Sequence, residues 1–324
     1  MVTMLCWGSW ANTQKMAANT WRFELFYWDY VVGILLFSLA LAFTFGSMGS
    51  GGRGFLADLA QASGKNIGSA IVGGIVFNAA NILLGAAIAI AGMAVAFPVG
   101  IGLALVIGVV VNYIAHPVGN AGLLAGGVAL IVVAILLNAS AYRRMKAGTR
   151  TSSGKGQTSN RGLTLAVAAG ILMGFFYKYV AASMFGDFEV PEPGKLSPYT
   201  AVVIFSVGIV LSNFVFNTLL MRRPFAGEPV SYAAYFKGGF RDHITGILGG
   251  SVWCLGMSLS IIASGKAGPA ISYGLGQGAT IVAALWGIFI WKEFSGAPKG
   301  TAAVLGGMLI FYLAGLWLLI NAGA

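Results

Sequence analysis

The side chains that could do chemistry in this chain are mainly neutral amides, hydroxyls and aromatic rings, and they lie within long apolar runs. Tyr273, Gln277 and Thr280 follow one another at i, i+4 and i+7 among glycines, which places them on one face of a helix. Asn78 and Asn81 lie three residues apart and also share a face. Groups of this kind bind a polar solute through a few convergent hydrogen bonds.

The elements that must position these side chains are membrane spans. From Asn66 to Tyr142 the chain runs 77 residues without Asp, Glu, Lys or Arg, and 58% of the whole sequence is hydrophobic. A hydrocarbon layer about 30 Å thick needs about 20 apolar residues per helical crossing, so this run alone holds about three spans. Strands of a membrane β-barrel would alternate in hydrophobicity over about ten residues, and these runs are solidly apolar. The sequence therefore predicts an all-α integral membrane protein.

The apolar runs predict ten transmembrane helices. The first is short, because only 14 residues precede Lys15 and they reach about 21 Å at 1.5 Å per residue. The expected spans lie near residues 1–18, 29–48, 68–91, 94–115, 120–141, 162–185, 198–221, 244–264, 267–291 and 301–322.

The distribution of positive charge predicts how the chain is oriented. Loops that follow odd-numbered spans carry 14 Lys and Arg residues, whereas the opposite loops carry four. Because positive charge is retained on the cytoplasmic side, we expect a multi-pass protein of the cell (plasma) membrane with both termini outside and the 143–161 loop in the cytoplasm. The net charge of +10 then reflects topology and requires no nucleic-acid partner.

The chain divides into two similar parts, a first five-helix repeat over 1–142 and a second over 162–324, joined by a basic linker over 143–161. Sliding Ile71–Val110 by 176 positions onto Ile247–Trp286 gives 12 identities in 40. An odd number of spans in each part inverts the second copy relative to the first. Inverted repeats are typical of secondary transporters, which bind substrate near the bilayer midplane. Chance similarity between Gly- and Ala-rich helices is the alternative.

Glycines and aromatic residues keep their register in this alignment. Gly73 and Gly74 fall on Gly249 and Gly250, and Phe77 falls on Trp253. Small residues let membrane helices approach closely, so we expect these glycines to mark tight helix crossings.

Three further side chains could face a solute. Trp253 lies four residues before Met257 in the eighth span, and Trp10 lies in the first, although tryptophan near a span end is also common at the membrane interface. Lys178 is the one charge in its span, where it either contacts substrate or extends toward the membrane surface. The amide residues could instead serve as interhelical contacts. The candidate substrate-binding residues are Gln277, Asn81, Tyr273, Asn78, Trp253, Lys178, Thr280 and Trp10.

Titratable groups give little sign of ion coupling or of an enzyme. All nine carboxylates are expected in loops or at span ends, so no mid-membrane acid of the kind used by proton relays is predicted. Asp29, at the start of the second span, is the best carboxylate candidate, with helix capping as the other interpretation. Proton coupling, sodium coupling and facilitated diffusion all stay open. His116 and His243 supply no metal or acid–base cluster, so no enzyme, metal or cofactor is expected.

Four segments, taken in order, resemble the ureide permease family, a branch of the drug/metabolite transporter superfamily that also holds glucose and rhamnose uptake proteins. The resemblance covers nearly the whole chain and implies ten helices and uptake of heterocyclic nitrogen compounds such as allantoin and oxo-pyrimidines. The segments are Trp28-Asp29-Tyr30 followed by Ala42–Gly46; Gly73-Gly74, Phe77 and Asn81; Val106-Ile107-Gly108 with Asn112-Tyr113; and Gly249–Trp286 followed by Trp291-Lys292-Glu293.

Two features depart from this family. The first helix is truncated, and the central loop is shorter than the loop of plant members, which carries a proposed nucleotide-binding motif. Gly148–Gly156 resembles a P-loop, but its spacing is one residue too long and Gly156 stands where a P-loop has Ser or Thr. We expect a solvated basic linker there and no ATP-driven pumping.

Together, the residues and the resemblance predict a secondary transporter that takes up a small, uncharged polar metabolite by alternating access: a ureide, a nucleobase or a sugar. The alternative is an exporter of drugs or metabolites on the same fold. A cationic drug would favour a buried carboxylate, which the predicted spans lack. A scaffold without transport would leave the polar stripe around Gln277 unexplained.

Overall fold

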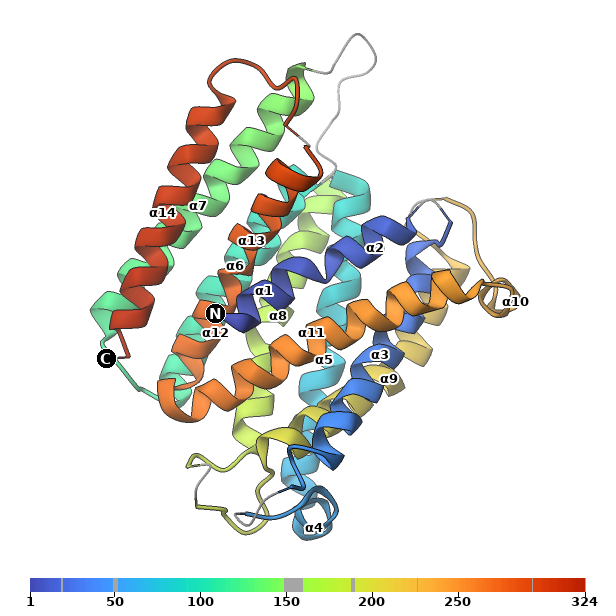
Figure 1. The fold of residues 1–324 in the computed structure, drawn as a ribbon, viewed down its shortest axis with the longest axis vertical. Helices are drawn as coiled ribbons and strands as arrows, with labels where there is room; N and C mark the ends of the chain where they lie inside the picture. Colours follow the sequence, from blue (N-terminus) through green and yellow to red (C-terminus); the bar gives the residue numbers. More distant parts are fainter. Residues whose placement is uncertain are drawn as a thin grey trace.

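The long apolar runs of the sequence fold as α-helices in the computed structural model (Figure 1). The structure describes residues 1–18, 20–48, 52–91, 93–148, 160–187, 190–225, 227–292 and 294–323. Within these ranges the only strand-like pairing is an isolated bridge between Met184 and Leu196. The predicted all-α class is therefore confirmed.

Eight helices of the described chain are long, and the remaining elements are short. The long ones are α3 (Phe23–Phe43), α5 (Gly64–Ala91), α6 (Met93–Ala115), α7 (Ala121–Gly148), α8 (Asn160–Ser183), α9 (Pro198–Arg222), α11 (Phe240–Ala267) and α14 (Thr301–Asn321). The short ones are α1 (Val2–Ser9), α2 (Ala11–Ala17), α4 (Phe55–Gln61), α10 (Tyr232–Phe236), α12 (Pro269–Gln277), α13 (Ala279–Leu285) and the π-helical turn η1 (Trp286–Ile290).

Eight segments of the described chain are long and apolar enough to cross a membrane. Seven of them lie in α3, α5, α7, α8, α9, α11 and α14, and the eighth, Pro269–Ile290, joins α12, α13 and η1. α6 contributes a shorter apolar segment, Val99–Ala115, and residues 2–17 form the two short helices α1 and α2. The chain is thus an integral membrane protein, and the count of ten spans stays a prediction.

Two of the expected elements differ from the structure. α3 begins at Phe23 with Arg22 as its N-cap, so Asp29 lies inside the helix and the capping role considered for it is wrong. The ninth apolar segment is broken at Gly278, where α12 ends and α13 begins. The break separates Thr280, in α13, from Tyr273 and Gln277, which both lie in α12.

Glycines allow two pairs of helices to cross with their backbones in direct contact. A β carbon on Gly250 of α11 would lie 1.9 Å from the carbonyl oxygen of Tyr30 in α3. A β carbon on Gly74 of α5 would lie 2.1 Å from the carbonyl oxygen of Phe205 in α9. Only glycine fits where backbones approach this closely. The tight crossings predicted at Gly74 and Gly250 are therefore confirmed.

The two ends of the bundle differ in their connections. We call the end that holds the described residues of 18–22, 223–239 and 291–300 the basic end, and the end that holds α4 and the described residues of 184–197 the opposite end. In Figure 1, α10 lies at the right edge, α2 lies above and to the left of it, and α4 lies at the bottom.

Candidate substrate-binding site

Five of the eight predicted binding residues line one cavity in the middle of the bundle. This central cavity has a volume of about 140 Å³, and residues of α1, α2, α5, α6, α8, α11, α12 and α13 contribute to its wall. The predicted residues that meet there are Trp10, Asn81, Trp253, Gln277 and Thr280.

The apolar wall of the central cavity is aromatic. Trp253 stacks against Trp7, with ring centroids 5.8 Å apart and an interplanar angle of 12°. Phe77 lies on Trp253 at 4.5 Å, and Phe176 packs edge-on against Phe77 at 5.2 Å. The Trp7 Nε1–H donates to the carbonyl oxygen of Trp253 at 3.2 Å, which holds α1 against α11. Faces of this kind favour a flat or ring-shaped solute.

The polar wall centres on Gln277. Its side chain lines the cavity and, within the described chain, makes no hydrogen bond to protein. The neighbouring Thr280 hydroxyl is already engaged, because it donates to the carbonyl oxygen of Gln277 at 3.0 Å and accepts from the hydroxyl of Tyr312. An amide carries two donor hydrogens and an acceptor oxygen, so Gln277 keeps its hydrogen-bonding capacity for a solute.

Three predicted residues do not line the central cavity. Tyr273 is fully buried, and its hydroxyl donates to the carbonyl oxygens of Ala104 and Met173 at 3.2 and 3.1 Å. Asn78 is also fully buried and bonded within the protein. Lys178 is exposed on the outer surface of α8. Tyr273 and Asn78 therefore connect helices, and Lys178 lies away from the cavity.

Several cavity residues were not among the sequence candidates, namely Trp7, Phe77, Leu84, Ile101, Met173 and Phe176. Phe77 could have been predicted from the sequence, because the internal alignment places it on the candidate residue Trp253. In the structure the two rings are in contact. The others belong to ordinary apolar runs, in which nothing separates a cavity wall from helix packing.

Two larger cavities adjoin the central one and extend toward the basic end. One, of about 700 Å³, shares Trp10 and Asn81 with it and reaches Arg22. The other, of about 350 Å³, shares Thr280 with it and reaches Lys15. Both are lined by α2, so they pass on either side of this short helix.

Toward the opposite end, the buried residues Tyr177 and Tyr273 pack behind Phe176, which is part of the wall of the central cavity. The Tyr177 hydroxyl donates to the carbonyl oxygen of Ser260 at 3.0 Å, which joins α8 to α11. The hydroxyl of Ser272 donates to the same carbonyl at 2.6 Å. Tyr177 also packs against Tyr273, with ring centroids 5.4 Å apart. The cavity is therefore open toward the basic end and closed toward the opposite end.

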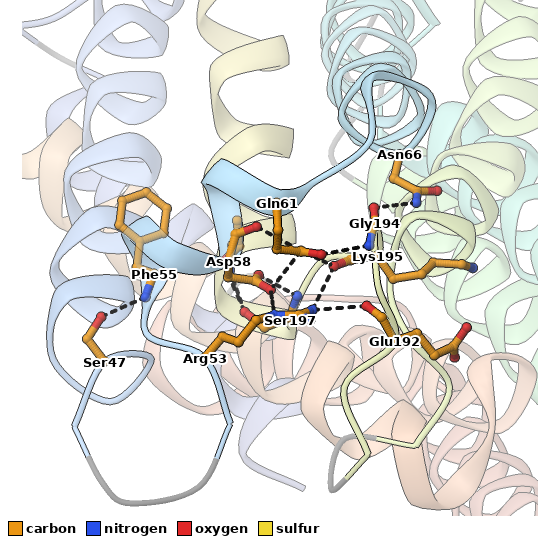
Figure 2. Close-up of polar contacts among 11 residues, drawn as sticks. Ser47, Arg53, Phe55, Asp58, Gln61, Asn66, Glu192, Gly194, Lys195 and Ser197 are labelled. Carbon is orange, nitrogen blue, oxygen red and sulfur yellow. Dashed lines mark hydrogen bonds and ion pairs between the residues drawn. The ribbon is translucent and has the colours of Figure 1, made fainter.

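A second closure at the opposite end joins the two parts of the sequence, and Figure 2 shows it. Asp58 of α4 is fully buried, and its carboxylate accepts from Arg53 Nε at 3.0 Å and from the backbone N–H of Ser197 at 2.7 Å. Arg53 also donates to the carbonyl oxygens of Glu192 and Lys195 at 3.0 and 3.1 Å. We call Arg53, Asp58 and the 192–197 backbone that they bind the outer latch.

A buried carboxylate lies at the basic end, apart from the central cavity. Asp29 accepts hydrogen bonds from Trp21 Nε1 at 2.9 Å and from the Tyr235 hydroxyl at 2.6 Å, and it pairs with His243 Nδ1 at 2.9 Å. Burial, together with the hydrogen bond to Asp29 and its charge, raises the pKa of the Tyr235 phenol, which therefore stays a donor. Among the described residues, no group of three or more His, Cys, Asp or Glu side chains could hold a metal ion.

These features define the class: a polytopic α-helical membrane protein with a solute-sized cavity open toward one end. The family model described as Ureide permease matches residues 26–161 and 148–322. The chain belongs to the ureide permease family, as the sequence motifs predicted.

Curated relatives are similar to the chain along nearly its whole length. Ureide permease 1 of Arabidopsis thaliana is 21% identical, and the alignment covers 99% of this chain and 95% of that protein. Ureide permease 2 of the same plant is 23% identical, with the same coverage. A solved crystal structure with 15% sequence identity matches 100% of this chain and 96% of its own, with a TM-score of 0.61, and so shares the fold. The protein is accordingly a membrane transporter of small polar metabolites.

Proposed function

We propose that the protein takes up a small, uncharged polar metabolite, a ureide first and a nucleobase or sugar next, through the plasma membrane by alternating access. The observation that carries this proposal is the Gln277 amide, which faces an aromatic-lined cavity without a protein partner among the described residues. A cyclic ureide offers carbonyl and N–H groups in one plane, which match an amide at its edge and aromatic rings at its faces.

The size and charge of the central cavity support a small neutral substrate over a drug. Its volume of about 140 Å³ is below the roughly 300–1,000 Å³ that is usual for drug-sized ligands. The described residues of its wall include no carboxylate to pair with a cationic drug. Export of drugs or metabolites on this fold is therefore the second candidate.

Matching helix crossings support two inverted five-helix repeats, over 1–142 and 162–324. Gly74 and Gly250 lie 176 positions apart, and the residues that they approach, Phe205 and Tyr30, lie 175 apart. Each repeat thus supplies one partner to each crossing in the same register, as expected for copies related by a two-fold axis.

The buried tyrosines and the outer latch close the opposite end, which supports an inward-open state if the basic end faces the cytoplasm. In that orientation both termini lie outside, and the two larger cavities form the cytoplasmic exit. The linker over 143–161 belongs on the same side, although residues 149–159 lie outside the described residues. The P-loop-like segment from Gly148 to Gly156 falls mostly within that gap. The proposal includes coupling of uptake to protons or sodium ions. Allantoin uptake into proteoliposomes under an imposed proton or sodium gradient tests it.

The experiment compares Gln277→Leu with the parent protein for allantoin binding by calorimetry and for allantoin uptake into proteoliposomes. Losing a hydrogen bond to a neutral group costs about 0.5–1.5 kcal/mol, so we expect affinity to fall about two- to twelve-fold. The melting temperature should be retained, because the side-chain amide of Gln277 has no protein hydrogen bond among the described residues to lose.

Tyr273→Phe is the matched control, because it removes two hydrogen bonds within the protein just before the break in the same span. It should lower the melting temperature and leave the affinity for allantoin close to that of the parent. A Gln277→Leu protein that melts early and binds allantoin normally would contradict the site. A thermal-shift screen of ureides, nucleobases, sugars and cationic dyes then ranks the substrate classes, because binding raises stability by RT ln(1 + [L]/Kd).

A further inference from the structure

Tyr27 of α3 lies between two asparagines of α5. Its hydroxyl donates to Asn78 Oδ1 at 2.9 Å and accepts from Asn81 Nδ2 at 3.1 Å. Tyr27 and Asn78 are both completely buried. Asn81 is only partly buried, and its side chain lines both the central cavity and the 700 Å³ cavity. One hydroxyl therefore connects a residue of the protein interior to a residue of the cavity wall.

The direction of these hydrogen bonds is set by backbone carbonyls, which can only accept. Ser212 donates its hydroxyl hydrogen to the carbonyl oxygens of Gly208 and Ile209, at 2.8 and 3.0 Å, so toward Asn78 it can only accept. Asn78 Nδ2 donates to Ser212 Oγ at 2.9 Å and to the carbonyl oxygen of Ile209 at 3.3 Å. Asn78 must therefore present its NH2 group to α9 and its Oδ1 atom to Tyr27.

The same reasoning passes through Tyr27 to Asn81. Because Asn78 offers Tyr27 an acceptor, the single hydroxyl hydrogen of Tyr27 is used there. The Tyr27 oxygen can then only accept, so Asn81 must present its NH2 group to Tyr27. The Asn81 Oδ1 atom is left without a hydrogen bond in the described protein, and it is not among the atoms buried from solvent.

We propose that Tyr27 is a positioning residue that fixes the amide of Asn81 with its carbonyl oxygen toward the cavity, so that transport selects substrates carrying an N–H or O–H donor at that point. This inference rests on the proposed function, because it assigns Asn81 one half of substrate recognition. Gln277 has no such constraint and can turn its amide either way, so it tolerates a donor or an acceptor. Selectivity for a donor therefore comes from the α5 side of the cavity.

The inference is tested with two competitors of allantoin uptake that differ in one ring position. Pyrrolidin-2-one has an N–H where γ-butyrolactone has a ring oxygen, and both keep the carbonyl to which Gln277 can donate. A site built around an acceptor rejects a ligand that lacks the donor. We expect the lactam to compete at least about five-fold more strongly than the lactone in the parent protein, and the ratio to fall below about two-fold in Tyr27→Phe, where Asn81 is free to turn.

Tyr30→Phe is the matched control. Tyr30 lies on the same helix, is completely buried and has a hydroxyl without a hydrogen-bond partner in the described protein. Its removal should leave the lactam-to-lactone ratio unchanged. A lactam that competes no better than the lactone in the parent, or a ratio in Tyr27→Phe equal to that of the parent, overturns the inference.

A measurement without ligand separates this inference from the proposed function. Tyr27→Phe leaves Asn78 Oδ1 buried without its partner, so the purified protein should melt about 2–4 °C lower, whereas Tyr30→Phe removes an unpartnered hydroxyl and should not melt lower. Equal melting temperatures for the two variants overturn the hydrogen-bond chain. Failure of the parent to bind or transport allantoin, with the melting difference present, counts against the proposed function and leaves the chain supported.

Discussion

Gly74 of α5 faces the carbonyl oxygen of Phe205 in α9 so closely that a β carbon on Gly74 would lie 2.1 Å from it. The reverse holds one turn away, where a β carbon on Gly208 of α9 would lie 2.4 Å from the carbonyl oxygen of Ile71 in α5. The two helices therefore meet through glycines on both sides, and neither can move away from the other without losing backbone contact.

Enlarging a glycine of such a crossing should destabilise the protein. Gly74→Leu forces α5 away from α9, and overpacking of this kind typically costs about 1–3 kcal/mol, or more where backbone must move. We expect low expression and a lowered melting temperature in detergent. Gly68→Leu is the control on the same helix, because nothing lies within 4 Å of a β carbon there. Equal stability of the two variants would refute the crossing.

Weakening the outer latch should favour opening of the opposite end. Asp58→Asn removes the charge that pairs with Arg53, and Asp58→Leu also removes the acceptor for the Ser197 N–H. A buried acceptor or donor without its partner costs about 1–3 kcal/mol. We expect a cysteine at Phe77, in a Cys6→Ala, Cys254→Ala background, to be labelled faster from the outside in these variants, with Leu exceeding Asn.

Lys65→Met is the control for the latch. Lys65 is exposed at the start of α5, and its side chain makes no hydrogen bond or ion pair to the outer latch among the described residues. Its substitution should leave the labelling rate unchanged. Labelling rates of the Asp58 variants that equal the parent rate would show that the latch does not hold the cavity closed.

The proposed orientation predicts opposite labelling of the two ends. A cysteine at Lys237, at the basic end, should resist a membrane-impermeant thiol reagent in intact cells, and so should one at Ser153, which lies outside the described residues. A cysteine at His116, in the exposed connection after α6, should be labelled readily. The reverse pattern would invert the topology and turn the open cavity toward the outside.

Lys178→Met should leave binding intact. The side chain is exposed on the outer surface of α8 and does not line the central cavity, so its charge makes no contact with a solute there. We expect the affinity for allantoin to stay within about two-fold of the parent, well below the effect of Gln277→Leu. A loss as large as that of Gln277→Leu would place Lys178 on the transport path in another state of the protein.

Much of the fold followed from hydrophobicity, because a run of apolar residues has few alternatives in a bilayer. The runs around Asn81, Trp253 and Gln277 became helices whose polar or aromatic groups turn inward, since such groups are costly against lipid. The same reasoning could not place Tyr273. Helical spacing puts it on the face of Gln277 within α12, but its hydroxyl is bonded to the carbonyl oxygens of Ala104 and Met173, and the spacing carries no sign of those partners.

The contacts that close the opposite end could not be read from the sequence. Gln61, at the end of α4, donates to the carbonyl oxygen of Lys195, which lies 134 positions away in a loop, and the two segments share no sequence pattern. Asp58 looks like a solvent-exposed loop residue in the sequence, although it is completely buried in the structure. Asp29 was expected at the start of a helix because the uncharged apolar run begins after it. The helix α3 begins earlier, at Phe23, so Asp29 lies inside it.

The glycine crossings join helices from the two parts of the chain on either side of the central linker. α3, from the part of the chain before residue 143, is held to α11, from the part after residue 161, and α5 is held to α9 in the same way. The helices whose backbones meet at these crossings are therefore not neighbours in the chain. Cutting the backbone between residues 148 and 160 would yield two fragments that each lack one helix of both crossings, so each fragment needs the other to complete its packing.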